Sequence, residues 1–546
     1  MSFSRVNASA ATSTRTRTES SPCSGMCVVC LDGCPGTCEI AMSALRGREM
    51  LYPQPFGQVT AGSAKEYPID FSHFSIQGSC VGAEGVEADS DKAIFPNVDL
   101  SLEIGAKEKM KLKVPFFTGA LGSTEIARVH WENMAIGAAI CGTIIVIGEN
   151  VCAMDPQSEI KNGRVVRSPE MERRVGIFKD WDKGIGEVIV QMNVEDTRLK
   201  VGEYAIEKLG VRAVELKWGQ GAKDIGGEVK LPSLKRALQL NDRGYPVFPN
   251  PEDPEVQKEF KEGVFGEFER HSRLGMVDEE EFYRKVEELR EAGAKYVTLK
   301  TGAYRPRDLA RAVKFASNAR IDLLTVDGAG GGTGMSPWRM MNEWGIPTVY
   351  LECLLYNYLN TLKEMGAFVP PCAMAGGLSL EDHIFKALAL GAPYISATCL
   401  GRSSMAAAMV GNTVGERIKK GKIPSRLKKY GDSLDHIFIM TDHLKEKYGR
   451  DFEKIPAGAI GMYSYYDRLA VGLRQFMAGA RKFNLKTITR SDLVALTPEA
   501  SRVSNIPYIM EADREEVEEI LRGGLADNGV FQEVDKAPSR FLTSKR

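Results

Sequence analysis

The sequence predicts an α/β protein built on a parallel (β/α)8 barrel, the TIM-barrel class. From residue 113 onward, eight short apolar runs alternate with amphipathic helical patterns. Polar residues or glycines follow nearly every run, as in barrels that carry chemistry at the C-terminal ends of their strands. An open doubly wound sheet is the alternative, and the eight units favour closure. The expected strands are 113–118, 141–147, 187–193, 213–217, 296–300, 322–326, 371–375 and 394–398.

Length and composition restrict the class of protein. The chain has 546 residues, a hydrophobic fraction of 43% and a formal net charge of −1. This balance gives no reason to expect a nucleic acid or an anionic membrane as partner. The apolar run 138–147 is too short to span a bilayer. We therefore expect a cytoplasmic protein without a membrane span, assembled as a homo- or hetero-oligomer.

The N-terminal region divides into a tail and a cysteine-rich segment. Residues 1–22 are rich in serine and threonine, which favours a disordered tail over a transit peptide. Residues 23–110 are expected to form a metal-binding segment and an arm that covers the barrel. In a chain with no export signal, crowded cysteines indicate a metal or cluster rather than disulfides. The cysteines of this segment are Cys23, Cys27, Cys30, Cys34 and Cys38.

The spacing of these cysteines suits an iron–sulfur cluster. Successive thiols are separated by three, two, three and three residues, so any four of them could hold one [4Fe–4S] cluster. Cys34 precedes Pro35, as the last ligand of ferredoxin-type runs often does. A zinc site is one alternative. The CxxxCxxC spacing of the first three cysteines also suits a radical-SAM enzyme.

Helical periodicity predicts the elements that surround the strands. The barrel is expected to occupy 111–420, with a long insertion at 219–295 that contains a helix at 279–291. Residues 421–546 are expected to form a C-terminal helical extension, with a charged helix at 513–522 and no chemistry of its own. The expected barrel helices are 123–137, 196–209, 307–317, 336–344, 380–390 and 403–420.

Several predicted strand ends carry residues suited to binding a flat, phosphorylated cofactor. The sixth strand runs into the glycine loop of 322–337, where backbone N–H groups can approach a ligand closely; it includes Gly330, Gly331 and Gly332. Lys300 ends the fifth strand, and a cation there must be paired or face a ligand. Gln191 places an amide at the end of the third, which can donate to and accept from the edge of a flavin.

A phosphate site is predicted beyond the last two strands. Gly376 and Gly377 follow the seventh strand, and Gly401 and Arg402 follow the eighth, each pair just before a helix. Glycine turns at helix N-termini with an arginine beside them suit a phosphate. Barrels most often hold phosphate at this place.

These motifs together resemble the FMN-binding domain of the glutamate synthase family. The resemblance covers about residues 113–412 and rests on LKTG, TVDGAGGGTGMSP, AGGLSLEDHIFKALALGA and CLGR. TGALG at 118–122 and KWGQGAKDIGGEVKLP at 217–232 are similar to the same domain. The combination of GGTGMSP and QGAK is specific, whereas the glycine pair with a later GR is shared by many FMN barrels.

The resemblance implies roles for individual residues. Lys300 would face the N1/O2 edge of FMN, and Gly119 and Ala120 would lie behind its ring. Glu149 and Lys223 would be catalytic with Lys300. The substrate, an imino acid or 2-oxoglutarate-like small carboxylate, would be bound by Lys217, Gln220 and Lys223. The charge of Arg305 also favours a carboxylate substrate.

The sequence departs from the family at places that affect the substrate and the electron path. The family's GAKPGEGG is replaced by GAKDIGGE, and its GEGG by GENV at 148–151. The family's three-cysteine cluster motif after the barrel is absent, because LGRSSMAAAMVGN follows Cys399 without another cysteine. The N-terminal cluster would therefore relay electrons from a ferredoxin or a reductase subunit. Ammonia would be free or would come from a separate glutaminase subunit. The alternatives are an FMN and iron–sulfur electron-transfer subunit of a larger complex and a radical-SAM barrel.

Overall fold

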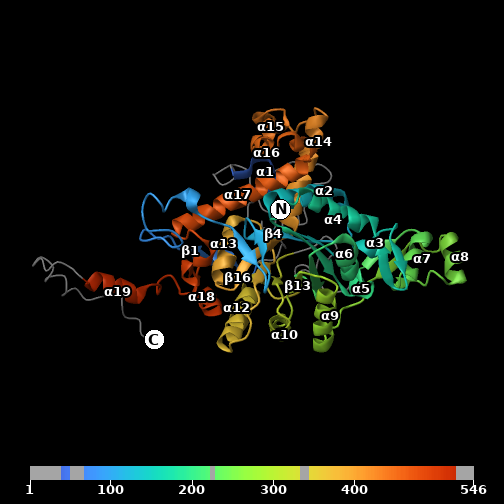
Figure 1. Cartoon of the computed structure of the whole chain (residues 1–546), viewed down its shortest axis with the longest axis horizontal. Coiled ribbons are helices and arrows are strands. Elements are labelled where there is room, and N and C mark those ends of the chain that lie inside the picture. Colours follow the sequence, from blue (N-terminus) through green and yellow to red (C-terminus); the bar gives the residue numbers. More distant parts are fainter. Residues whose placement is uncertain (1–38, 49–66, 222–227, 332–342, 524–546) are drawn as a thin grey trace, which may run out of the picture.

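A closed barrel of eight parallel strands forms the centre of the protein (Figure 1). The computed structural model describes residues 39–48, 67–221, 228–331 and 343–523. The strands follow one another around the barrel in chain order, and the last pairs with the first. The prediction of a (β/α)8 barrel is confirmed. The strands are β4 (Phe116–Leu121), β5 (Ile144–Ile147), β8 (Glu187–Met192), β9 (Ala213–Lys217), β13 (Tyr296–Thr301), β14 (Leu323–Asp327), β15 (Cys372–Ala375) and β16 (Ile395–Leu400).

The inside of the barrel is packed with side chains. Because side chains alternate along a strand, every second residue points inward. One buried cluster gathers these inward residues, including Phe117, Ile189, Ala213, Tyr296 and Cys399. The next inward positions toward the strand ends are polar or glycine. The alternation therefore puts a polar layer on top of an apolar floor.

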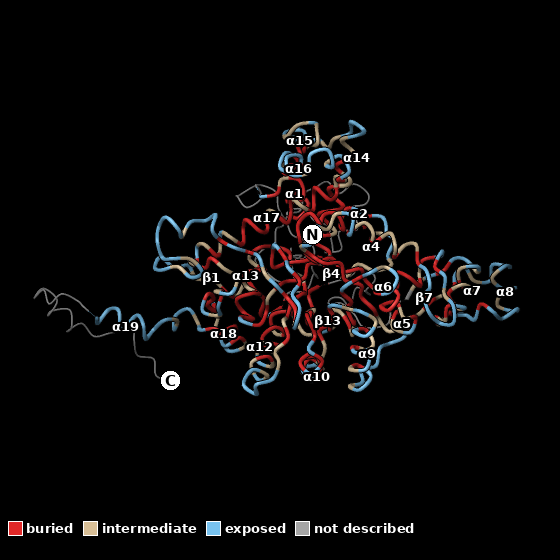
Figure 2. Tube along the Cα trace, viewed as in Figure 1, coloured by how far each residue is buried: buried red, intermediate tan, exposed pale blue. Residues whose placement is uncertain are grey.

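The barrel helices lie outside the strands, and the buried part of the chain is concentrated at the centre (Figure 2). Local signals fix the helix ends. The Thr124 side chain accepts from the Ala127 N–H at the start of α2, and Gly142 ends that helix with a left-handed φ of 67°. The helices that alternate with the strands are α2 (Glu125–Cys141), α4 (Pro169–Trp181), α6 (Val201–Leu209), α9 (Glu279–Glu291), α10 (Pro306–Asn318), α12 (Thr348–Glu364), α13 (Glu381–Leu390) and α14 (Arg402–Lys419).

Some element boundaries differ from the sequence predictions for identifiable reasons. The first strand begins at Phe116 rather than at 113, directly after Pro115, which has no N–H to donate to a neighbouring strand. The helix expected at 196–209 is two helices, α5 (Val194–Arg198) and α6, because Lys200 between them has a φ of 56°. The arm contains a helix that the sequence analysis does not predict, α1 (Glu39–Arg46). Most of the helix expected at 336–344 lies outside the described residues.

The insertion at 219–295 has more structure than the single helix predicted there. That helix is confirmed as α9 (Glu279–Glu291). The insertion also contains a three-stranded antiparallel sheet in the order β10 (Glu228–Leu231), β12 (Phe268–His271), β11 (Val247–Phe248). Two more helices accompany it, α7 (Leu234–Asp242) and α8 (Pro254–Lys261). Strands of two to four residues are too short to show a clear period in the sequence.

The C-terminal part of the chain packs onto the barrel. The long helix α17 (Ala457–Gly479) contacts α1, α2, α13 and α14. Strand β17 (Leu493–Ala495) pairs antiparallel with β1 (Phe74–Ile76), so the arm and the C-terminal part of the chain share a small sheet. The predicted charged helix is α19 (Arg514–Arg522), which extends away from the body (Figure 1). Across the described residues, no helix combines the length and the apolar character needed to cross a membrane.

Candidate functional site

The polar layer at the strand ends contains a buried ion pair. The Nζ atom of Lys300, at the end of β13, lies 3.1 Å from Oδ2 of Asp327, at the end of β14. Burial disfavours the ammonium ion, but Asp327, Cys399 and Glu215 favour it more strongly, and together they raise the pKa of Lys300. Lys300 is therefore a cation held at the C-terminal end of the barrel.

A buried carboxyl group lies next to this pair. Glu215, in the middle of β9, accepts hydrogen bonds from Nε2 of Gln191 at 2.6 Å and from Oγ1 of Thr298 at 3.3 Å. Burial raises its pKa, although Lys300 and these donors act in the opposite direction. The bond to Glu215 orients the Gln191 amide. Sequence reasoning missed Glu215, whose signal was a glutamate inside the apolar strand, two residues before Lys217.

A second ion pair forms where the loops after β5 and β9 meet. The Nζ atom of Lys217 lies 2.6 Å from Oε2 of Glu149 and 3.1 Å from Oε1 of Gln220. The structure thus brings together three of the residues predicted for the substrate side. The fourth, Lys223, lies outside the described residues.

The insertion adds a buried guanidinium close to these loops. Arg270 of β12 is 3% exposed, lies over the ring of Tyr245 at 4.7 Å and donates to Ser272. Its Nε has no hydrogen-bond partner among the described residues. The Tyr245 hydroxyl donates to Asn150, the residue next to Glu149, at 2.7 Å. Sequence reasoning missed Arg270, since only the fold of the insertion brings it to this side of the barrel.

Burial and neighbouring charges act on Arg270 in opposite directions. Burial lowers its pKa, while Tyr245, Glu195 and Glu149 favour its charged form. A guanidinium stays protonated in proteins even when its pKa falls. The insertion thus contributes a positive charge near Glu149.

Glycines at the strand ends leave room for a ligand or allow close packing. At Gly401, which precedes α14, an added Cβ would meet no atom within 4 Å. At Gly119 it would come within 2.6 Å of Sγ of Cys399, so the Cys399 side chain packs directly on the backbone of β4 at this position. Gly376 and Gly377 follow β15 with φ values of 125° and 86°, which few other residues adopt.

The two turns after β15 and β16 also carry buried polar groups. Arg402, the first residue of α14, is 8% exposed. The hydroxyls of Ser379 and Ser403 are buried and have no hydrogen-bond partner within the described ranges. A buried hydroxyl without a partner costs free energy, which a ligand with acceptor atoms would recover.

The remaining predicted site residues are placed only in part. Gly330, with a φ of 117°, and Gly331 follow β14, whereas Gly332 lies outside the described residues. Ala120 is half-buried near the end of β4. The five N-terminal cysteines all lie outside the described part. Within that part, no three histidine, cysteine, aspartate or glutamate side chains are grouped to hold a metal ion.

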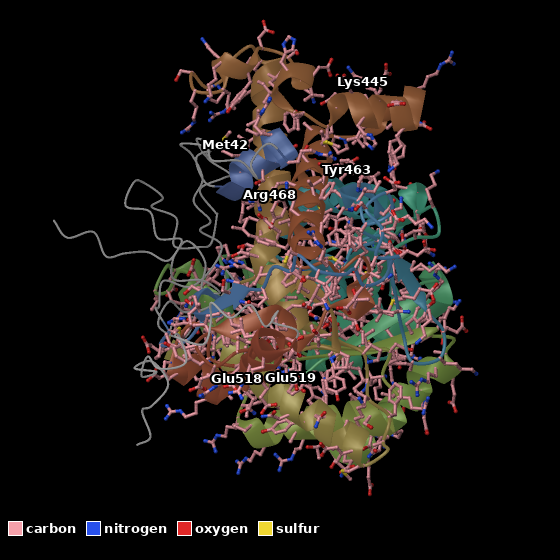
Figure 3. The ribbon with its side chains drawn as sticks, turned by 90° about the vertical axis from the view of Figure 1, so that its left-hand side faces the viewer. Met42, Lys445, Tyr463, Arg468, Glu518 and Glu519 are labelled. Atoms are coloured by element: carbon pink, nitrogen blue, oxygen red, sulfur yellow. The ribbon has the colours of Figure 1, made fainter. Side chains whose placement is uncertain are left out.

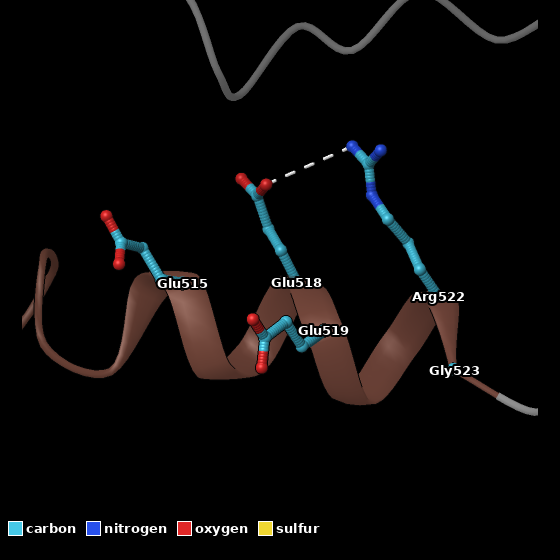
Figure 4. Close-up of a pocket in the computed structure, with 5 residues that line it drawn as sticks. All are labelled: Glu515, Glu518, Glu519, Arg522 and Gly523. Carbon is cyan, nitrogen blue, oxygen red and sulfur yellow. Dashed lines mark ion pairs between the residues drawn. The ribbon is translucent and has the colours of Figure 1, made fainter.

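The described residues also line two hollows. One, of about 390 Å³, is lined by Tyr304, Arg305 and Trp344. The other, of about 540 Å³, lies against α19, where Glu515, Glu518, Glu519 and Arg522 line it (Figure 4). Its Arg522 pairs with Glu518 on the same helix at 3.9 Å. Surface pairs of this kind are a common feature of solvated helices.

Part of the chain is similar to known proteins. Residues 270–410 match the model described as the conserved region in glutamate synthase. The glutamate synthase large subunit-like protein YerD of Bacillus subtilis (strain 168) is 27% identical over 230 residues. That match spans 39% of this chain and 39% of the length of that protein.

Solved structures resemble the chain only distantly. The flavin-binding domain of baker's yeast flavocytochrome b2 has a TM-score of 0.45 and 12% identity, over 87% of this chain and 84% of that one. A soluble mutant of the membrane-associated (S)-mandelate dehydrogenase from Pseudomonas putida has a TM-score of 0.43 and 13% identity, over 78% and 88%. Similarity at this level does not bear on the chemistry.

Proposed function

We propose that the chain is a glutamate synthase-like FMN oxidoreductase, because residues 270–410 match the model described as the conserved region in glutamate synthase. The observation that carries the proposal is the buried ammonium of Lys300, paired with Asp327 at the C-terminal end of the barrel. A cation in this position suits an electron-rich ring edge. FMN would supply the redox chemistry, while the protein binds and orients the reactants.

The residues after β15 and β16 fit the phosphate of FMN. The open space at Gly401, the buried guanidinium of Arg402 and the hydroxyls of Ser379 and Ser403 lie in two turns that each precede a helix. Helix N-termini and an arginine both favour a dianion. Arg402 would pair with the phosphate oxygens, and the N–H groups of the two turns would donate to them.

The polar layer fits the ring of FMN. Lys300 would hold its positive charge at the pyrimidine edge and so favour the anionic reduced form. The NH2 group of Gln191 donates a hydrogen bond to Glu215, so Gln191 would present its carbonyl oxygen to the ring as an acceptor. Gly119 and Ala120 would lie behind the ring.

The substrate would lie beside Glu149, Lys217 and Gln220. Two cations, Lys217 and the buried Arg270, face a region that also contains Glu149, and this combination suits a small dicarboxylate or its imino derivative. Glu149 would be the acid–base group beside the reacting carbon, and Lys223 would assist from the adjacent segment. The segments GAKDIGGE and GENV differ from the family's motifs on the substrate side. We therefore propose a small carboxylate similar to 2-oxoglutarate as the substrate, rather than 2-oxoglutarate itself.

Electrons would enter through a [4Fe–4S] cluster held by four of the five N-terminal cysteines. The donor would be a ferredoxin or a reductase subunit, and ammonia would be free or come from a separate glutaminase subunit. This part of the proposal rests on the sequence spacing alone, since these cysteines lie outside the described residues.

The test is the steady-state formation of glutamate from 2-oxoglutarate with ammonia or glutamine, using chemically reduced ferredoxin as donor. Product formation that depends on Lys217 would support the proposal. Flavin reduction without any product would instead favour an electron-transfer subunit. A chain that holds no flavin would contradict both.

A further inference from the structure

Helix α17, which follows the barrel in the sequence, contacts both turns proposed to hold the phosphate. Tyr463 and Arg468 of this helix lie in the upper half of the view in Figure 3, near Met42 of α1. Most of its residues are buried, including Tyr465, Tyr466 and Arg468. Its packing partners are α1, α2, α13 and α14. It is therefore a buried helix of the core rather than a cap on the surface.

Close packing fixes α17 against α14. A Cβ added at Gly461 would come within 2.9 Å of the Ala407 carbonyl oxygen, and one at Gly411 within 2.8 Å of the Ala457 carbonyl oxygen. Backbones this close leave little room for the two helices to slide, because protein interiors are packed at high density. Side chains farther along α17 therefore reach fixed positions on the barrel.

Two side chains of α17 contact the turn after β15 and the start of α13. The Tyr465 hydroxyl donates to the Ser379 carbonyl oxygen at 2.5 Å. The Arg468 guanidinium donates to the carboxylate of Glu381, the first residue of α13, and Arg468 is only 2% exposed. Removing one partner of a buried ion pair leaves the other uncompensated. These two contacts therefore fix the turn that contains Ser379.

The residue between them contacts the start of α14. The Tyr466 hydroxyl lies 2.8 Å from Oγ of Ser404 and 2.8 Å from Oγ1 of Thr118 on β4. Its ring packs edge-to-face on Phe116 at 5.1 Å. One hydroxyl thus links the first turn of α14 to the first strand of the barrel.

The helical period explains how one helix reaches both turns. Residues three apart lie on nearly the same side of a helix, so Tyr465 and Arg468 point toward α13, while Tyr466 points about 100° away. We propose that Tyr465, Tyr466 and Arg468 are positioning residues that hold the N-termini of α13 and α14 at the spacing a bound phosphate needs. The link to phosphate rests on the proposed function, whereas the positioning of the two turns does not.

The experiment compares conservative variants with controls on the same helix. Tyr465→Phe and Tyr466→Phe each remove one hydroxyl, and Arg468→Met with Glu381→Gln removes the ion pair without leaving a lone charge. Tyr463→Phe and Arg474→Met are the controls, since Tyr463 stacks on His443 and Arg474 donates to the Val98 carbonyl. Neither control residue has a contact with the two turns among those described above.

Two measurements separate positioning from general stability. The first compares the dissociation constants of FMN and riboflavin, which lacks the phosphate. Combining the hydroxyl deletions should weaken FMN binding about tenfold and leave riboflavin binding within about twofold. The second is hydrogen exchange of flavin-free protein, in which the amides of 380–384 and 402–405 should exchange faster in the variants than in the controls.

The outcomes are distinguishable. Equal weakening of FMN and riboflavin, or no weakening of either, would overturn the link to the phosphate. Unchanged exchange in both turns would overturn the positioning itself. If the wild-type protein binds no flavin, the proposed function fails, and the exchange measurement alone decides whether α17 positions the turns.

Discussion

The ammonium group of Lys300 lies 3.1 Å from the carboxylate of Asp327, on the neighbouring strand, at the C-terminal end of the barrel. Asp327 and other neighbouring groups raise the pKa of Lys300, so this side chain stays charged throughout the physiological range. The pair therefore combines a permanent positive charge with a carboxylate that offsets part of it. Changing either residue should therefore shift the reduction potential of a bound flavin, in opposite directions for the two residues.

Lys300→Met should lower the midpoint potential of the flavin, and Asp327→Asn should raise it. Two unit charges about 4 Å apart at an effective dielectric constant of 20 interact by about 4 kcal/mol. A shift of up to about 90 mV is therefore expected for Lys300→Met in a two-electron couple. Spectroelectrochemical titration of the flavin-loaded variants measures it. An unchanged potential in a folded, loaded Lys300→Met protein would remove Lys300 from the flavin edge.

Arg402→Ala should weaken FMN retention by about 2 kcal/mol or more, because a charge-assisted contact with a phosphate is lost. Flavin content after gel filtration and the dissociation constant measure the effect. Arg417→Ala, near the other end of α14, is the matched control. Full occupancy and unchanged affinity in Arg402→Ala would place the phosphate elsewhere.

Lys217→Met should raise the KM for the carboxylate substrate about tenfold or more while FMN stays bound. The reason is the loss of a cation that lies 2.6 Å from Glu149 and beside Gln220. Lys230→Met is the control, because Lys230 forms an exposed ion pair with Glu269 on the insertion. Equal effects of the two substitutions on KM would argue against a substrate contact at Lys217.

Glu352→Gln should stabilise the protein increasingly as the pH rises. Glu352 on α12 is fully buried, and neither carboxyl oxygen has a hydrogen-bond partner in the described part of the chain. Burial raises its pKa well above the ordinary value of about 4.3, so the folded state keeps a proton that the unfolded chain releases. The wild-type protein therefore loses stability as the pH rises above that value.

Urea denaturation at about pH 5 and about pH 8 measures this difference. The difference in the free energy of unfolding between the variant and the wild type should grow with pH in favour of the variant. The growth should be about 1 kcal/mol or more for each pH unit between the pKa of Glu352 in the unfolded chain and its pKa in the folded protein. Glu364→Gln, an exposed position on the same helix, should show the pH dependence of the wild type. If the stability of Glu352→Gln depended on pH as that of the wild type does, the wild-type carboxyl group would have to be stabilised by a hydrogen-bond or charged partner.

The cysteine-rich segment should hold one [4Fe–4S] cluster. Anaerobically purified protein should contain about four iron and about four acid-labile sulfide atoms per chain. Serine replacements of the ligands among Cys23, Cys27, Cys30, Cys34 and Cys38 should abolish flavin reduction by ferredoxin. Stoichiometric zinc without iron would instead indicate a structural site and a donor that reduces the flavin directly.

The sequence predicted the barrel because each strand is a short apolar run followed by polar residues or glycine. Lys300 and Gln191 are predicted for the same reason, since each stands at or near the end of such a run, whereas Lys217 is predicted from the family resemblance of the segment 217–232. Glu215 and Arg270 were missed because their burial and partners arise only when distant segments pack together. The contacts of α17 are of the same kind, since Arg468 meets Glu381 across 87 residues of sequence.

The flavin content of the purified chain tests the central claim most directly. Protein purified in the dark and denatured should release FMN at about one molecule per chain, identified by chromatography and mass. The Arg402→Ala variant should release less, and the Arg417→Ala control should release as much as the wild type. A folded wild-type chain that contains no flavin and binds none on titration with FMN would contradict the account.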